Sequence, residues 1–73
     1  MEATNNATPL RLLRRHEVER QTGLARSSLY DLIRADRFPR PVALTTTARA
    51  WRSDEIEQWI AARIAARDAQ AAS

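Results

Sequence analysis

The chain has one glycine, Gly23, and it stands between two stretches with helical periodicity. Glycine adopts the left-handed backbone conformation at little steric cost, and it is common just past the end of a helix. A first helix therefore fits residues 15–22. Leu24 then folds back on Val18, which is the hydrophobic contact that often accompanies such a cap. A second helix fits residues 26–35 directly after this turn, and the pair indicates a helix-turn-helix.

The second predicted helix has one apolar and one polar face. Leu29, Leu32 and Ile33 follow the i, i+3, i+4 spacing of a buried stripe. The outward face carries hydroxyl and guanidinium groups, which read base edges in the major groove of DNA. We expect such contacts from five residues: Arg26, Ser27, Ser28, Tyr30 and Arg34. Two alternatives stay open: one serine caps the helix, or the tyrosine ring leans on the core and only its hydroxyl reaches a phosphate.

Residues 38–41, Phe-Pro-Arg-Pro, end the second helix, because proline removes a hydrogen-bond donor and disfavours helical geometry in the residue before it. Two short strands, 42–44 and 49–51, follow on either side of a Thr-Thr-Thr tip. The tip has no Gly or Asn to supply a positive φ, so we expect a loose wing. Contacts with flanking phosphates or the minor groove are expected from four residues, with solvated surface charge as the alternative for each: Arg37, Arg40, Arg49 and Arg52.

Residues 53–67 form the last predicted helix. Ser53 is a suitable N-cap, and the two acidic residues after it complement the positive end of the helix dipole. An apolar stripe runs from Ile56 to Ile64 and faces the core. The large aromatic side chains are expected in this core and not as stacking platforms for bases: Phe38, Trp51 and Trp59.

These elements predict a mainly α fold with a small β-hairpin wing, that is, a winged helix-turn-helix of three helices and two short strands. The domain covers residues 10–68. A polar, aperiodic arm at residues 1–9 precedes it and is expected to be disordered. Residues 69–73 are expected to form a frayed tail.

Positive charge is concentrated in the central part of the chain. Residues 11–52 hold ten of the twelve arginines and only four of the nine acidic residues, and the whole chain has a formal net charge of +3. A basic region of this kind favours a polyanionic partner. Arg14 and Arg15 lie near the first helix, which crosses the DNA backbone in this architecture, so we expect phosphate contacts from them. Pairing of Arg15 with a nearby glutamate is the alternative.

Composition excludes several other classes of protein. The chain has no cysteine and a single histidine, His16, so it has neither a disulfide framework nor the ligands of a zinc centre. No paired carboxylates, nucleophile with a base, or phosphate-binding glycine loop is visible. We therefore expect no enzymatic activity, catalytic residue, metal or cofactor. No apolar stretch approaches the roughly 18 residues that span a bilayer, and no secretion signal is visible, so we expect a cytoplasmic, nucleoid-associated location.

Several short strings in a fixed order carry a family resemblance: Leu12-Leu13-Arg14, Glu17-Val18, Thr22-Gly23-Leu24, Arg26 to Tyr30, Arg37 to Val42, Trp51-Arg52, and Glu55-Ile56 with Trp59-Ile60. In this combination the chain resembles the AlpA family of phage regulatory proteins over about residues 11–64. The resemblance implies a MerR-like winged fold. It also implies a protein that prophages and integrated elements use either as a transcription regulator or as an excisionase that bends attachment-site DNA for an integrase.

Several positions depart from that family pattern, among them the Thr-Thr-Thr tip and Ala50, which stand where the wing usually has small or glycine residues. Arg15 stands where Leu is common, Ala25 where Ser usually caps the second helix, and Asp36 where Gly usually closes it. A missing cap costs a helix about 1 kcal/mol. Asp tolerates left-handed geometry better than most residues other than glycine.

The sequence thus predicts a sequence-specific protein for double-stranded DNA. A domain this small covers few base pairs, so we expect several copies side by side on DNA, or an integrase as partner. The alanine-rich end and the exposed face of the last helix are candidate contact surfaces. The alternative is an adaptor that docks on a phage or recombination protein and touches DNA only electrostatically.

Overall fold

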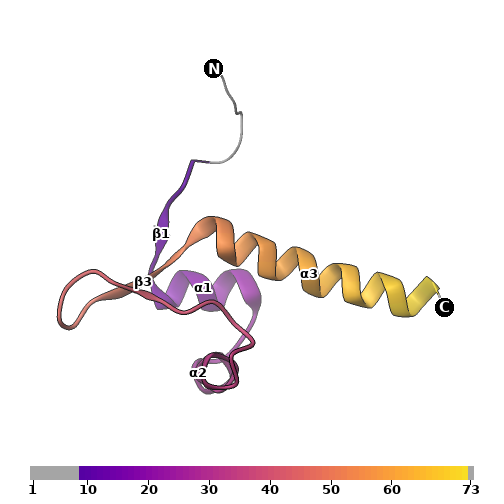
Figure 1. Ribbon diagram of the computed structural model, residues 1–73, viewed down its shortest axis with the longest axis horizontal. Coiled ribbons are helices and arrows are strands. Elements are labelled where there is room, and N and C mark those ends of the chain that lie inside the picture. Colours follow the sequence, from indigo (N-terminus) through magenta and orange to yellow (C-terminus); the bar gives the residue numbers. More distant parts are fainter. Residues whose placement is uncertain (1–8, 73) are drawn as a thin grey trace.

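The computed structural model describes residues 9–72. Its elements, in chain order, are β1 (Leu12–Leu13), α1 (Arg15–Thr22), α2 (Arg26–Arg34), β2 (Val42–Ala43), β3 (Arg49–Arg52) and α3 (Ser53–Ala72) (Figure 1). The predicted mainly α fold with a small antiparallel hairpin is confirmed, and it is compatible with a winged helix-turn-helix. The predicted arm at residues 1–9 lies outside the described residues except for Pro9.

The three strands form one small sheet in the order β1–β3–β2, and both pairings are antiparallel. Leu13 lies opposite Trp51, and Val42 lies opposite Ala50. β1 adds to the predicted elements, because two residues are too few for the alternating pattern of a strand to appear in a sequence. This strand fixes the segment before α1 to the wing and so brings the start of α1 beside β3.

Ser53 also holds the segment before β1 in place through two hydrogen bonds with Arg11. Its N–H donates to the carbonyl oxygen of Arg11, and its hydroxyl oxygen accepts the N–H of Arg11, each at 2.8 Å. The predicted N-cap role of Ser53 is therefore corrected, because its oxygen serves the segment before β1. At the start of α3 the carboxylate of Asp54 instead accepts the N–H of Glu55 at 2.8 Å.

The turn between α1 and α2 is built around Gly23, which has a φ of 77° and donates its N–H to the carbonyl oxygen of Glu19. The hydroxyl of Thr22 donates to the carbonyl oxygen of Val18 at 2.8 Å and accepts the N–H of Leu24 at 3.2 Å. Leu24 packs against the core cluster that contains Val18. The predicted glycine end of the first helix is confirmed.

The hydrophobic core joins the helices to the sheet, and its most buried members are Leu13, Val18, Leu29, Phe38, Trp51 and Ile56. Phe38 meets the half-buried Trp59 edge to face, with ring centroids 4.9 Å apart. The indole N–H of Trp51 donates to the carbonyl oxygen of Pro39 at 2.9 Å. That of Trp59 donates to the carbonyl oxygen of Arg37 at 2.9 Å. The predicted core role of the aromatic residues is confirmed, and the two indoles also fix the link between α2 and β2.

The wing formed by β2 and β3 closes through Thr45. Its hydroxyl oxygen accepts the N–H of Thr47 at 3.2 Å and that of Ala48 at 2.9 Å. The carbonyl oxygen of Ala48 accepts the N–H of Leu44 at 2.8 Å. None of the tip residues, all of which the structure describes, has a positive φ. We expected a loose tip without Gly or Asn, and the threonine hydroxyl supplies the missing closure.

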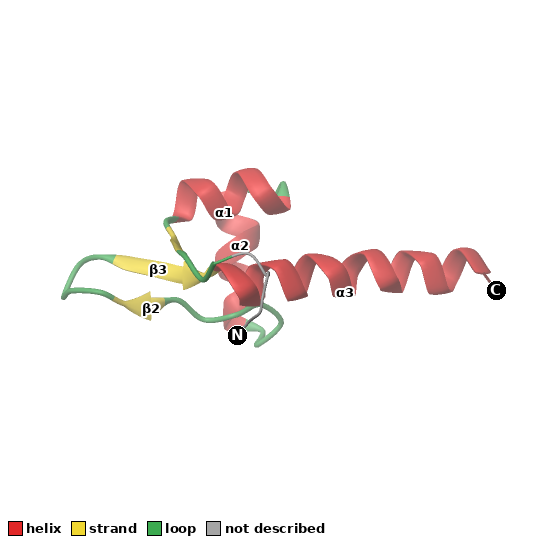
Figure 2. Ribbon diagram, turned by 90° about the horizontal axis from the view of Figure 1, so that it is seen from above, coloured by secondary structure: helices red, strands yellow, loops and turns green. Residues whose placement is uncertain are grey.

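α3 projects beyond the rest of the molecule, on the side away from the wing (Figures 1 and 2). Its first turns carry Ile56 into the core, whereas residues 61–71 are all exposed. The predicted end near Arg67 is wrong, because the helix continues to Ala72 and includes residues 69–72 of the expected frayed tail. Alanine is the strongest helix former, and the alanine-rich sequence explains the extension. Within residues 9–72, no helix is both long and apolar enough to cross a membrane.

Candidate nucleic-acid interface

α2 presents its polar face to solvent, because its apolar face closes on the core. Leu29 is fully buried, and Leu32 and Ile33 pack against the core cluster. Four of the five side chains predicted to read base edges are exposed: Arg26, Ser27, Ser28 and Arg34. Within the described part of the chain neither serine makes a side-chain hydrogen bond, so both hydroxyls are available to a ligand.

A groove lies between the start of α1, α2 and the wing, and we call it the basic groove. It has a volume of about 460 Å³, and the residues that line it are Arg14, Arg15, His16, Tyr30, Thr47, Arg49 and Trp51. The pairing of Leu13 with Trp51 holds the start of α1 against the wing and so forms the groove. Tyr30 reaches it from α2 and is half-buried, as expected if the ring leans on the molecule and the hydroxyl faces outward.

Among the described residues, none that lines the basic groove is acidic. Arg15 is held by Glu19 of its own helix at 2.6 Å, so the alternative of a local ion pair is the arrangement found. Arg14 and Arg49 have no ion-pair partner among residues 9–72. Their guanidinium groups can therefore meet an anion without first leaving a carboxylate. The concave shape concentrates their field at one place.

A second hollow runs along α2 itself, lined by Ala25, Arg26, Ser27, Tyr30, Asp31 and Arg34. Tyr30 borders both this hollow and the basic groove, so the two form one continuous surface. Arg34 is hydrogen-bonded to Asp31 on the exposed side of the helix. Arg26 has no such partner in the described chain, which leaves it the more available of the two arginines.

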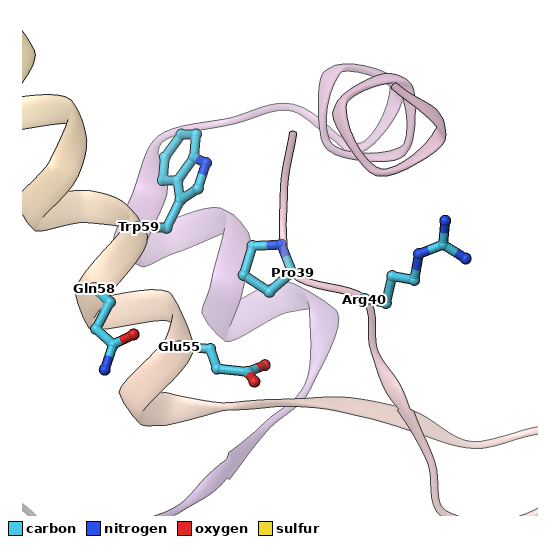
Figure 3. Close-up of a pocket in the computed structure, with 5 residues that line it drawn as sticks. All are labelled: Pro39, Arg40, Glu55, Gln58 and Trp59. Atoms are coloured by element: carbon cyan, nitrogen blue, oxygen red, sulfur yellow. The ribbon is translucent and has the colours of Figure 1, made fainter. Parts of the chain in front are cut away.

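The other predicted phosphate contacts lie away from the basic groove. Arg37 and Arg40 belong to the link between α2 and β2. Arg40 is 3.7 Å from the carboxylate of Asp36. It also lines a different hollow, which is formed with the first turns of α3 by Pro39, Glu55, Gln58 and Trp59 (Figure 3).

Arg52 is engaged at the start of α3. Its Nε donates to Asp54 Oδ1 at 3.1 Å, and its Nη2 donates to Oδ2 at 2.8 Å. These hydrogen bonds lower the pKa of the Asp54 carboxyl, and the same bonds together with the carboxylate charge raise the pKa of Arg52. Both groups therefore stay charged near neutral pH, and the guanidinium is directed to the helix and not to the wing tip.

The arrangement is suited to binding an extended anion. An exposed helix face with two free hydroxyls and a free guanidinium adjoins a groove with two more unpaired guanidinium groups. Arginine forks onto phosphate oxygens and onto the edge of guanine. Among residues 9–72, no group of three or more His, Cys, Asp or Glu side chains could hold a metal ion.

Comparison with known proteins agrees with this geometry. Residues 11–64 match the family described as prophage CP4-57 regulatory protein, AlpA. The chain belongs to the AlpA family. It is also 45% identical over 60 residues to a protein of Enterobacteria phage P4 named "Uncharacterized protein ORF88", and the alignment covers 82% of this chain and 68% of the phage protein. The chain is thus a member of a family of prophage regulatory proteins.

The departures from the AlpA pattern are visible in the structure. Ala25 precedes α2 with φ −75° and ψ 161° and gives no side-chain hydrogen bond to the helix, so the expected loss of a cap is confirmed. Asp36 has a φ of 62°, which is the left-handed geometry that Gly usually provides at this position of the family. Arg15 is accommodated at the half-exposed start of α1 through its ion pair with Glu19.

Two lining residues of this AlpA-family groove escaped the sequence analysis. From the sequence, His16 was considered only as a metal ligand, and Thr47 was placed only in the wing tip. Both lie in the basic groove. Their approach depends on the pairing of β1 with β3, and no local pattern in the sequence records it.

Proposed function

We propose that this AlpA-family chain is a sequence-specific protein for double-stranded DNA. The observation that carries the proposal is the continuous surface made by the exposed face of α2 and the basic groove, with Arg14, Arg26 and Arg49 unpaired in the described chain. In the proposed complex α2 enters the major groove with Arg26, Ser27 and Ser28 toward base edges. Arg14 and Arg49 then contact phosphates of the DNA backbone on either side of the helix.

The other arginines predicted to contact DNA remain part of the proposal, but we expect each of them to contribute less to the affinity. Arg34, Arg40 and Arg52 each lie beside a carboxylate, so binding of a phosphate competes with an existing ion pair. Arg15 is in the same position with Glu19. Arg37 has no acidic partner in the described residues but lies outside the basic groove.

Two uses of DNA binding are compatible with the family, namely transcription regulation and direction of recombination as an excisionase. A regulator would protect one operator, whereas an excisionase would protect adjacent repeats and bend them for an integrase. Nuclease footprinting followed by a bending assay on the same fragment distinguishes the two. Strong bending over adjacent repeats would favour the excisionase and an integrase partner.

Selection from a random duplex library tests DNA binding itself. We expect enrichment of a defined sequence, and we expect Arg26→Ala together with Arg34→Ala to weaken binding to that sequence by at least about tenfold, since one good arginine contact to a base is worth about 1–3 kcal/mol. If no sequence is enriched and the double variant binds duplex as the parent does, the proposal fails. The chain would then be better described as a protein-interaction adaptor.

A further inference from the structure

A regular seam of side chains on α3 starts beside the core, where Ile60 packs against the core cluster, and continues along the exposed half of the helix. Glu57, Ile60, Ile64, Arg67 and Ala71 are spaced alternately by three and four residues, which aligns them along one side of the helix. Ile64 is 48% exposed and the Arg67 side chain 75% exposed, while Ile60 is half-buried where the seam leaves the core. Past its first turns, where residues 61–71 are all exposed, the helix projects clear of the other elements (Figure 1).

The charges of the seam are complementary to the same seam run in the opposite direction, in which Arg67 exchanges its exposed pair with Asp68 of its own chain for Glu57 of the second copy. If two copies cross antiparallel at the level of residue 62, each Glu57 lies opposite Arg67 of the second copy. In the same register each Ile60 lies opposite Ile64 of the second copy. Two ion pairs then flank four isoleucines, and a two-fold axis relates both halves, as closed symmetric dimers require. A parallel pairing would instead set Glu57 against Glu57 and Arg67 against Arg67.

We propose that the projecting half of α3 is the interface between two copies of this chain, paired antiparallel through Glu57, Ile60, Ile64 and Arg67. The paired surface is short compared with a standard protein interface, so the dimer is weak in solution. Arg63 flanks the seam near the crossing point, where it approaches its own copy, and this like-charge approach also limits the affinity. Two copies held on one DNA molecule would meet at a much higher effective concentration.

The interface is tested without DNA, so its failure is separable from failure of DNA binding. Sedimentation equilibrium of the whole chain up to about 1 mM should give a reversible dimer, because weak interfaces dissociate in the micromolar to millimolar range. Glu57→Arg alone and Arg67→Glu alone each replace two attractive pairs by two repulsive ones. Each variant should weaken the dimer by about tenfold or more.

Combining the two charge reversals gives a sharper test. A mixture of Glu57→Arg and Arg67→Glu chains should form a heterodimer, and the double variant should again form a homodimer. Ala62→Arg is the matched control, because this exposed position lies on the opposite side of the helix and should leave association unchanged. Circular dichroism checks that every variant keeps its fold. A chain that is monomeric at about 1 mM, or charge reversals without effect and without mutual rescue, would overturn the proposal.

Discussion

The two sides of this small domain carry similar numbers of arginines and use them differently. On the side of the basic groove, Arg15 and Arg34 are paired with a carboxylate, but Arg14, Arg26 and Arg49 have no acidic partner in the described chain. On the side of α3, Arg40 and Arg52 lie beside Asp36 and Asp54. The helix starts differ in the same sense, since the first turn of α3 contains acidic residues and that of α2 contains none. The two hollows therefore differ in their acidic residues: no described acidic residue lines the basic groove, whereas Glu55 lines the hollow beside α3.

The largest expected effect comes from the unpaired arginines of the groove. Arg14→Ala with Arg49→Ala should weaken binding to the selected duplex by about 30-fold, at roughly 1 kcal/mol for each lost phosphate contact. The slope of log affinity against log salt should also fall by about 1.8, at roughly 0.9 for each contact. Arg40→Ala with Arg52→Ala is the matched control, because it removes the same charge from the α3 side. Equal losses of DNA affinity in the two double variants would contradict the difference between the two sides.

Substitution at the start of α2 separates helix stability from binding. Ala25→Ser and Ala25→Asp should each raise the free energy of unfolding by about 1 kcal/mol, because each supplies the side-chain cap that Ala25 lacks. Only the aspartate brings a negative charge to the binding surface, so it alone should lower DNA affinity. Denaturant unfolding and a binding titration of both variants measure the two effects. A serine variant that is no more stable than the parent would contradict the account of the missing cap.

Freeing Arg34 from its ion pair with Asp31 should change DNA affinity less than the substitutions above. Asp31→Asn removes the carboxylate beside Arg34 and one negative charge from the face of α2. Affinity for duplex should rise by about two- to threefold, in line with the small worth of an exposed ion pair. Asp68→Asn makes the same change beside Arg67, far along α3, and should leave the affinity unaltered. An equal gain in both variants would mean that net charge alone governs binding.

The smallest expected effect is a pH dependence on the α3 side. The hydrogen bonds from Arg52 lower the pKa of Asp54 below its ordinary value of 3.8. The carboxylate therefore stabilises the fold above pH 3.8, and this contribution is lost as the pH falls through the lowered pKa. Thermal unfolding should show Asp54→Asn less stable than the parent near neutral pH, with the difference shrinking below pH 3.8. A difference in Tm that does not change with pH would count against this ion pair.

Local signals in the sequence predicted the helices and their turn, because each rests on residues within one or two helical turns. Gly23, Leu24 and Leu29 are examples, and all three lie where the sequence placed them. The predicted end of α3 was too early, because alanine continues a helix without any packing partner.

The basic groove could be predicted only in part. Its arginines and Tyr30 were identified as binding residues from their type and position on helices or wing. Their convergence depends on β1, and the bonds between Ser53 and Arg11 join residues 42 positions apart. Contacts at such separation leave no periodic pattern in either segment, so His16 and Thr47 were found only in three dimensions.

Backbone amide chemical shifts during titration with a duplex that holds one selected site test the central claim most directly. We predict that the signals of Arg14, Ser27, Ser28 and Thr47 move together and saturate at one equivalent of duplex. Those of Glu55 and Gln58, which line the hollow in Figure 3 from α3, should stay in place. Movement confined to the first turns of α3, with α2 and the basic groove undisturbed, would contradict the account.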